Sequence, residues 1–224
     1  MKWSLGSLQA EWVSQVKELY YRFPSHVDIL RKALLPLQCH LPAISEVDMH
    51  ESYLPFLIVV TDQVLSLHDR MQWFRKSYDE ESLIQFSLDQ ITPLVSIPPT
   101  PCYLAVSVEN GSLTKIQLPL MGAVKVSVPE RSGLTVDEGV ALISYKKGDK
   151  LLWDYSLLLT GSEFNGQSRY NYFYQHQIPT LRMYAGEYDY GVALNHTIRG
   201  GPILTEACSS QEKLWGTPTC LIRM

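Results

Sequence analysis

The sequence predicts an α+β fold, with an N-terminal helical hairpin followed by a mixed, largely antiparallel sheet and a few packing helices. Helical spacing of apolar residues dominates the first part of the chain, and short β-branched runs between turn residues follow it. The C-terminal third is poor in helical periodicity and rich in Gly, Tyr and Thr. We expect a hairpin over residues 1–45 and an α+β domain over 46–224, with a candidate subdomain boundary at the proline-rich stretch 93–101.

Two helices are expected in the hairpin. Apolar residues recur at helical spacing over residues 8–23, with Ser7 as the expected N-cap and Pro24 beyond the end. A second helix should start at Ser25, with Asp28 three residues later as in a capping box. Its apolar stripe comprises Ile29, Leu30, Ala33 and Leu34.

The next segments predict a strand and a helix. The run "FLIVV" at 56–60 is typical of a strand buried on both faces. Apolar spacing over 62–75 predicts a helix. The stretch "SLIQFSLDQI" at 82–91 fits either a strand or a helix, and we favour the strand because Ile84, Phe86 and Leu88 alternate.

Later strands are predicted from turn signals and composition. In "CYLAVSVENGSLTKIQL", which begins at Cys102, an Asn-Gly pair separates two β-rich runs, and this pattern predicts a hairpin. Further strand-like stretches lie at 155–160, 170–174 and 180–194.

The stretch "RSGLTVDEGVALISY" at 131–145 raises the question whether adjacent carboxylates perform chemistry or start a helix. Thr135 and Glu138 match a capping box, in which each side chain accepts a hydrogen bond from the other residue's backbone N–H. Asp137 in the first turn also interacts favourably with the helix dipole. We therefore favour a structural role for both carboxylates and expect a helix that runs to about Tyr145.

Composition excludes several classes of function. The 224 residues carry 19 basic and 23 acidic side chains, a net charge of −4, and no basic run that would bind nucleic acid. The longest apolar run, "YLPFLIVV", is far shorter than the roughly 20 residues that a membrane span needs. Gln9 and Glu11 interrupt any signal-peptide pattern, so we expect a cytoplasmic protein whose four cysteines are reduced.

Metal and nucleotide sites receive little support. Glu46, Asp48 and His50 would share one face of an extended segment, where two carboxylates and an imidazole suit a divalent ion. We favour a solvated acidic loop, because such ligands usually come from separated elements. The sequence contains no glycine-rich phosphate-binding motif, and we expect no cofactor.

Three stretches resemble an uncharacterised bacterial family that is known only as a domain of unknown function. They are "CYLAVSVENG", "RSGLTVDEGVAL" and "GGPILTEACSS", and the similarity covers roughly residues 50 to 210. Gly133 stands where this family would lead us to expect proline, and "LTKIQLPLMGAVKV" lacks an expected acidic helical segment. The resemblance implies a bacterial, single-domain cytosolic protein, and it implies nothing about the substrate.

Function is expected to be binding rather than catalysis. Seven aromatic residues crowd into 170–190 beside several arginines, and such side chains are enriched at recognition surfaces. Cross-strand packing is an equally good explanation of this cluster. The expected partner is a protein or a small-molecule ligand, and a homodimer is a further alternative. The candidate binding residues are Tyr184, Tyr188, Tyr190, Arg182 and Arg199.

The alternative is an enzyme. Cys208 follows "GGPILTEA", and His196 and Asp189 lie upstream of it. An imidazole beside a thiol generates the thiolate that a cysteine-dependent hydrolase or transferase requires. A buried, unreactive cysteine is the commoner outcome for such a residue.

Overall fold

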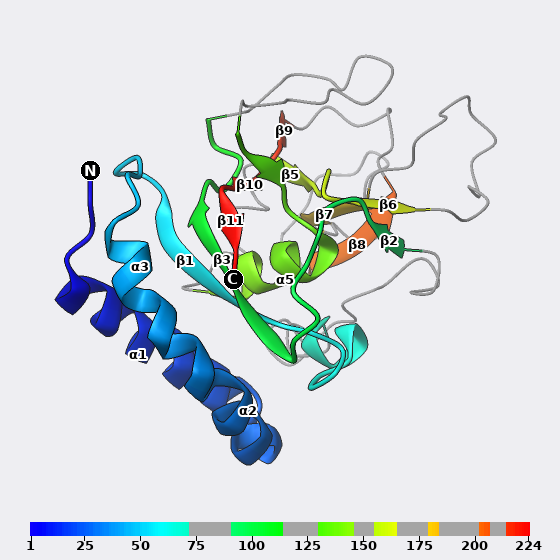
Figure 1. The fold of residues 1–224 in the computed structure, drawn as a ribbon. Coiled ribbons are helices and arrows are strands. Elements are labelled where there is room, and N and C mark those ends of the chain that lie inside the picture. The colour runs from blue at the N-terminus through cyan, green and yellow to red at the C-terminus, as the bar shows by residue number, and fades with distance from the viewer. Residues whose placement is uncertain (72–90, 114–129, 146–154, 165–178, 184–201, 207–213) are drawn as a thin grey trace, which may run out of the picture.

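The structure, a computed structural model, describes residues 1–71, 91–113, 130–145, 155–164, 179–183, 202–206 and 214–224. It confirms the α+β class, because helices come first and several mainly antiparallel sheets follow (Figure 1). None of the helices in these ranges is long and apolar enough to cross a membrane.

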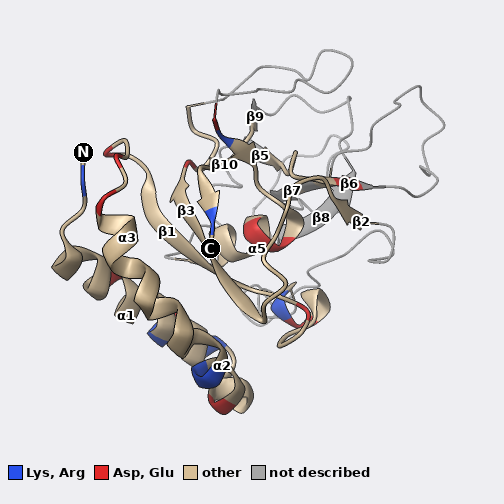
Figure 2. Ribbon diagram, in the orientation of Figure 1, with Lys and Arg blue, Asp and Glu red and all other residues tan. Residues whose placement is uncertain are grey.

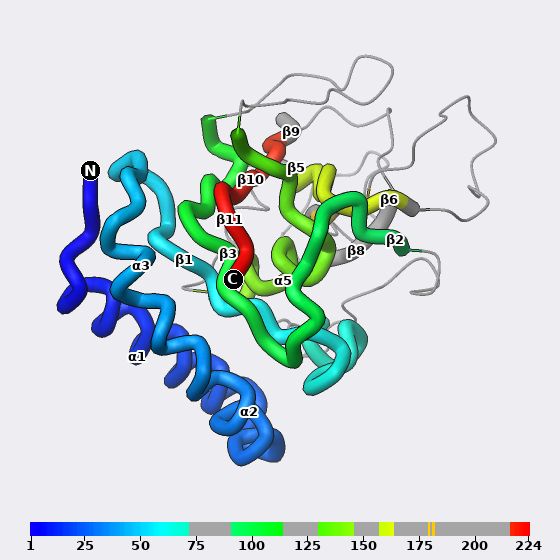
Figure 3. Tube along the Cα trace, viewed as in Figure 1, coloured from blue at the N-terminus to red at the C-terminus, as the bar shows by residue number. Residues whose placement is uncertain are grey.

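The N-terminal hairpin consists of one long helix and a broken return arm. Helix α1 spans Leu5–Arg22, and its N-cap is Ser4, whose Oγ accepts a hydrogen bond from the Ser7 N–H at 3.1 Å. The expected cap at Ser7 is therefore wrong by one turn. The return arm runs antiparallel to α1 (Figures 1 and 3), and it comprises η1 (Pro24–His26), α2 (Val27–Leu34), η2 (Leu35–His40) and α3 (Leu41–Ser45).

Proline explains the broken arm, because Pro36 and Pro42 each lie in the first turn of the piece that contains them. Leu30 and Leu34 are buried as the apolar stripe predicts. Ile29 is 52% exposed, so its place in that stripe is wrong. The stripe is narrower than the sequence pattern suggests.

A three-stranded antiparallel sheet has the N-terminal hairpin on one face and helix α5 (Val136–Ser144) on the other. The strand order is β1–β3–β11, so β1 (Leu54–Val60) and β11 (Ile222–Arg223) flank β3 (Cys102–Val108). Side chains alternate along β1, so that Phe56, Ile58 and Val60 pack with the hairpin while Leu57 and Val59 pack on the opposite face. The predicted burial of both faces is confirmed.

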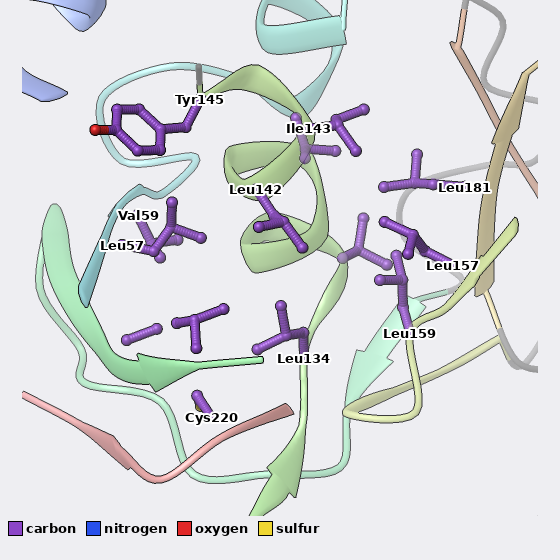
Figure 4. Packing of buried hydrophobic residues seen from close by; sticks show 14 of the residues in the cluster. Leu57, Val59, Leu134, Leu142, Ile143, Tyr145, Leu157, Leu159, Leu181 and Cys220 are labelled. Carbon is purple, nitrogen blue, oxygen red and sulfur yellow. The ribbon is translucent and has the colours of Figure 1, made fainter. Parts of the chain in front are cut away.

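Helix α5 (Val136–Ser144) covers the second face of this sheet, and it confirms the predicted capping box. The Thr135 Oγ1 accepts from the Glu138 N–H at 3.3 Å, and the Glu138 Oε2 accepts from the Thr135 N–H at 2.7 Å. In Figure 4, labelled side chains from α5, β1 and β5 converge on one apolar cluster. This cluster packs α5 against the face of β1 that carries Leu57 and Val59.

Smaller sheets complete the described fold. One sheet has the order β8–β7–β5–β9, in which only the β5–β9 pair is parallel. Two pairs, β2–β6 and β10–β4, are antiparallel. The bounds are β2 (Ile91–Pro93), β4 (Ser132–Gly133), β5 (Tyr155–Leu158), β6 (Ser162–Phe164), β7 (Pro179–Met183), β8 (Pro202–Glu206), β9 (Leu214–Gly216) and β10 (Thr219–Cys220).

The segment after β1 differs from its predicted helix over 62–75. Residues 62–65 form a turn, in which the Val64 and Leu65 N–H groups both donate to the Thr61 carbonyl, and helical structure begins at residue 67. The Ser66 Oγ accepts from the Asp69 N–H at 3.1 Å, which starts the helix there. The predicted strands at 82–90 and 170–174 lie outside the described residues.

Candidate functional site

The outer edge of β1 is the starting point of the candidate site. Because β1 pairs only with β3 among the described strands, every second residue points its backbone N–H and C=O away from the sheet. The Thr61 N–H donates to the Pro101 carbonyl, on the side of β3. The Ile58 N–H donates to Gln15, on the side away from β3. The outward residues are therefore Leu54, Phe56, Ile58 and Val60.

Gln15 of α1 occupies one position on this edge. Its Nε2 donates to the Phe56 carbonyl at 2.9 Å, and its Oε1 accepts from the Ile58 N–H at 2.8 Å. The carboxamide thus bonds the strand as a peptide of a neighbouring strand would. Gln15 is only 3% exposed, so these two hydrogen bonds form in a nearly water-free environment.

Arg70 occupies the other end of the edge. Its Nη1 donates to the Val60 carbonyl at 2.7 Å, while its Nη2 contacts the Asp62 carboxylate at 2.6 Å and the Asp137 carboxylate at 2.8 Å. Arg70 is 5% exposed, and two acidic partners compensate its buried charge. It therefore links the end of β1 to the start of α5.

A largely apolar groove lies over this edge, between the C-terminal half of α1 and the outer side of α5. It encloses about 490 Å³, which includes solvent at its mouth. Its polar groups are few and sit among apolar walls, an arrangement typical of small-molecule sites. The lining residues are Gln15, Glu18, Leu19, Arg22, Phe23, Leu57, Ile58, Val60, Arg70, Val140, Ala141, Ser144 and Tyr145.

Asp137 does not line the groove itself, but its carboxylate contacts the lining residue Arg70 at 2.8 Å. Burial raises the pKa of the Asp137 carboxyl above its usual range, although the adjacent Arg70 cation acts in the opposite direction. The side chain is a quarter exposed. This carboxylate therefore positions Arg70, and the structural interpretation of Asp137 is supported by its contacts.

Glu138, the second carboxylate of the pair, is completely buried and serves the fold. It accepts from Arg223 Nε at 2.6 Å and Nη2 at 2.9 Å, and from the Tyr103 hydroxyl at 3.1 Å. In Figure 2 the acidic part of α5 lies close to the C-terminal end of the chain, in agreement with this contact. Burial raises the pKa of the Tyr103 hydroxyl, so it remains a proton donor. The ion pair between Glu138 and Arg223 thus links the C-terminal strand β11 to α5.

A second arginine cluster lies near β10. The Arg131 Nη1 donates to the Ser107 Oγ at 3.2 Å, its Nε donates to the Thr219 Oγ1 at 2.9 Å, and its guanidinium lies 4.5 Å from the Tyr53 ring centre. Ser107 has a φ of 57°, an uncommon value for a buried non-glycine residue. Arg131 also bonds the Ser107 and Thr219 carbonyls, so it clamps β3 to β10 at this distorted point.

The described thiols are poor nucleophiles or isolated. Burial raises the pKa of both Cys102 and Cys220 to about 12, so neither forms a thiolate near neutral pH. Cys39 is exposed, and all three are free.

Most of the residues that the sequence analysis favoured for function lie outside the part of the chain that the structure describes. Tyr184, Tyr188, Tyr190 and Arg199 lie outside the described residues, and so do the alternative catalytic residues Asp189, His196 and Cys208. Arg182 lies in β7, paired with Ile203 of β8. Both hypotheses remain predictions.

The three candidate metal ligands follow α3. The Glu46 carboxylate pairs with the Lys2 ammonium at 2.8 Å, which lowers the pKa of Glu46, and the His50 Nδ1 bonds the Ser52 hydroxyl at 2.7 Å. The described residues contain no group of three His, Cys, Asp or Glu side chains that could hold a metal ion. Glu46, Asp48 and His50 thus form no such group.

Sequence reasoning missed Gln15 and Arg70, the two residues that define the β1 edge. Gln15 is seven residues after Leu8, three after Trp12 and four before Leu19, so it lies on the apolar face of α1. A polar residue at such a position must find a buried partner, and this was the available signal. Arg70 gave no comparable signal, because its partners lie far apart in the sequence.

Comparison with known proteins gives a family without an assigned activity. The model of the family of unknown function DUF5701 matches residues 22–171, which is about two thirds of the chain. This match starts earlier and ends earlier than the resemblance over residues 50 to 210. No curated protein and no solved structure matches the chain. The match includes β1, Arg70 and α5, and the chain belongs to the DUF5701 family of unknown function.

Proposed function

We propose that this chain is a binding protein, and that the groove between α1, the outer edge of β1 and α5 takes a small, mainly apolar ligand. The observation that supports this most is the groove itself, in which apolar walls from two helices enclose backbone polar groups of an edge strand. Edge strands and grooves between layers are common recognition sites, because their backbone groups bond a ligand without side-chain motion.

The chemistry of the groove favours binding over catalysis. Its two arginines already contact acidic partners, since Arg22 pairs with Glu18 at 2.7 Å and Arg70 pairs with Asp62 and Asp137. The described residues that line the groove include neither cysteine nor histidine. A neutral ligand therefore suits the groove better than a strongly charged one.

The setting of this function is also a proposal. We propose a cytoplasmic role in a bacterial cell. The free thiols of Cys39, Cys102 and Cys220 support a reducing compartment. The bacterial origin rests on the resemblance of the three quoted stretches.

The experiment is a titration with methyl butanoate, a small neutral ester, followed through the backbone amide signals in two-dimensional NMR spectra. We expect the shift changes to concentrate on the groove residues of α1, β1 and α5. Ser144→Phe should weaken this binding at least tenfold, because a ring at this half-buried lining position fills the groove.

Ala10→Phe is the matched control, because it places the same ring on an exposed position of α1 that does not line the groove. It should leave binding unchanged. Shift changes that map away from the groove, or equal effects of the two variants, would contradict the proposed function.

A further inference from the structure

We infer that the groove recognises its ligand through one primary carboxamide, which bonds the Ile58 carbonyl and the Val60 N–H between the side chains of Gln15 and Arg70. This inference rests on the proposed function and names the chemistry of the ligand. The observation behind it is an unpaired position on the outer edge of β1, which lies in the groove between the positions that Gln15 and Arg70 occupy.

The repeating unit of an edge strand is the carbonyl of one outward residue and the N–H of the next outward residue. On β1 one such unit is the Phe56 carbonyl with the Ile58 N–H, and Gln15 bonds both groups. The next unit is the Ile58 carbonyl with the Val60 N–H. Neither group of this second unit has a hydrogen-bond partner in the part of the chain that the structure describes.

Both residues of this second unit are buried, since Ile58 and Val60 are each 3% exposed. A buried backbone donor or acceptor without a partner is unfavourable, so a ligand that bonds both groups gains the free energy otherwise lost. Ile58 and Val60 also line the groove, so a bound molecule reaches this unit directly.

Gln15 shows which chemical group fits. Its carboxamide supplies a donor for the carbonyl, at 2.9 Å, and an acceptor for the N–H, at 2.8 Å. The second unit repeats the first two residues further along the same strand, so the same group from a ligand meets it in the same way. An ester or a carboxylate offers only acceptors to the Ile58 carbonyl, and neither completes the pair.

The neighbouring side chains limit the ligand to a single amide. On one side, Gln15 already bonds the Phe56 carbonyl and the Ile58 N–H. On the other side, the Arg70 Nη1 already donates to the Val60 carbonyl at 2.7 Å. An extended peptide that continued along β1 would have to displace one of them. The apolar part of the ligand lies instead toward the side chains of α5 that line the groove, which include Val140 and Ala141.

The test compares pentanamide with methyl butanoate, which has the same number of heavy atoms and lacks the N–H donors. We expect pentanamide to bind about tenfold more tightly, the effect of adding net hydrogen bonds in a buried site. One amide proton of bound pentanamide should also move downfield, because it bonds the Ile58 carbonyl, and the ester has no proton that could make this bond.

Val60→Pro removes the N–H donor, and proline is tolerated on an edge strand where that N–H points outward. The tenfold advantage of pentanamide should then disappear, while Val60→Ala, which keeps the N–H, should retain it. If Val60→Pro does not fold, the downfield shift of the pentanamide N–H proton on the wild-type protein decides the question.

Equal affinities for the amide and the ester in the groove would overturn this inference and leave the proposed function standing. Binding of neither probe in the groove would overturn both. Acetyl-tetraalanine amide serves as a third probe. Tighter binding of this peptide than of pentanamide, with displacement of Gln15, would also overturn the single-carboxamide inference.

Discussion

Two polar side chains, those of Gln15 and Arg70, bond backbone groups on the outer edge of β1, which lies among apolar residues. Gln15 and Arg70 each satisfy outward backbone groups of the strand, from two different helical segments. Edge strands usually avoid unwanted pairing through charges, bulges or cover, and here side chains that bond the backbone give part of that protection. The same residues delimit the unit that we assign to a ligand.

Replacing Gln15 with Leu should destabilise the protein by about 1–3 kcal/mol, because the Phe56 carbonyl and the Ile58 N–H lose their partners in a buried site. Urea denaturation measures the free energy of unfolding. Gln9→Leu, at an exposed position of the same helix, is the control and should change it by less than about 0.5 kcal/mol. A Gln15→Leu protein as stable as the control would contradict the role of this carboxamide.

Asp137 should make stability depend on pH. Because burial raises the pKa of this carboxyl in the folded state, the folded protein holds the proton more tightly than the unfolded chain does. Its contribution to stability is therefore greatest below the ordinary aspartate pKa of about 3.9, and it declines as pH rises through the raised folded-state pKa.

Asp137→Asn removes this titration. The unfolding free energy of the wild-type protein minus that of the variant should fall as pH increases from about 4 toward 7, and then level off. Urea denaturation at each pH measures the difference. A difference that grows with pH would show that Arg70 lowers the pKa more than burial raises it.

Among the elements, α5 connects the candidate site to the core, and its start was the most local feature of the sequence. Its capping box involves residues only three apart, so the sequence predicted it correctly. The same helix carries Asp137 toward Arg70 and Glu138 toward Arg223. These partners are distant in the sequence, and no local pattern could have indicated them.

Thr135→Ala should destabilise the protein by about 1 kcal/mol, since the Glu138 N–H loses its cap. Hydrogen exchange of the first-turn amides of α5 should accelerate. Thr135→Ser keeps the hydroxyl and should restore most of the protection. Unchanged exchange in Thr135→Ala would mean that packing alone fixes the start of this helix.

For the whole molecule, the sequence predicted the class and the order of elements but not the assembly of the sheets. Apolar periodicity is a local property, so α1 and β1 were predicted, and the burial of β1 on both faces followed from its composition. The C-terminal β11 comprises only Ile222 and Arg223, too few residues for any pattern, although it completes the central sheet. The hairpin shares an apolar cluster with β1 and β3, and the expected boundaries at 45 and at 93–101 stay predictions.

The tyrosine-rich stretch remains a separate prediction for the molecule as a whole. Strand alternation sends neighbouring side chains to opposite faces, so seven aromatic residues over 170–190 need either a second layer or a partner. Replacing both Tyr188 and Tyr190 with Ser should leave the unfolding free energy nearly unchanged and abolish dimerisation or partner capture. A loss of about 3–5 kcal/mol, typical of truncating buried aromatic residues, would instead place them in the core.

The most direct test of the central claim, that the outer edge of β1 is a ligand site, is an isotope-filtered nuclear Overhauser measurement on the protein with bound pentanamide. We expect contacts from the amide protons of pentanamide to the Val60 N–H, and from its alkyl chain to Ala141 and Ser144. Contacts confined to residues outside the groove, with none to Val60, would contradict it.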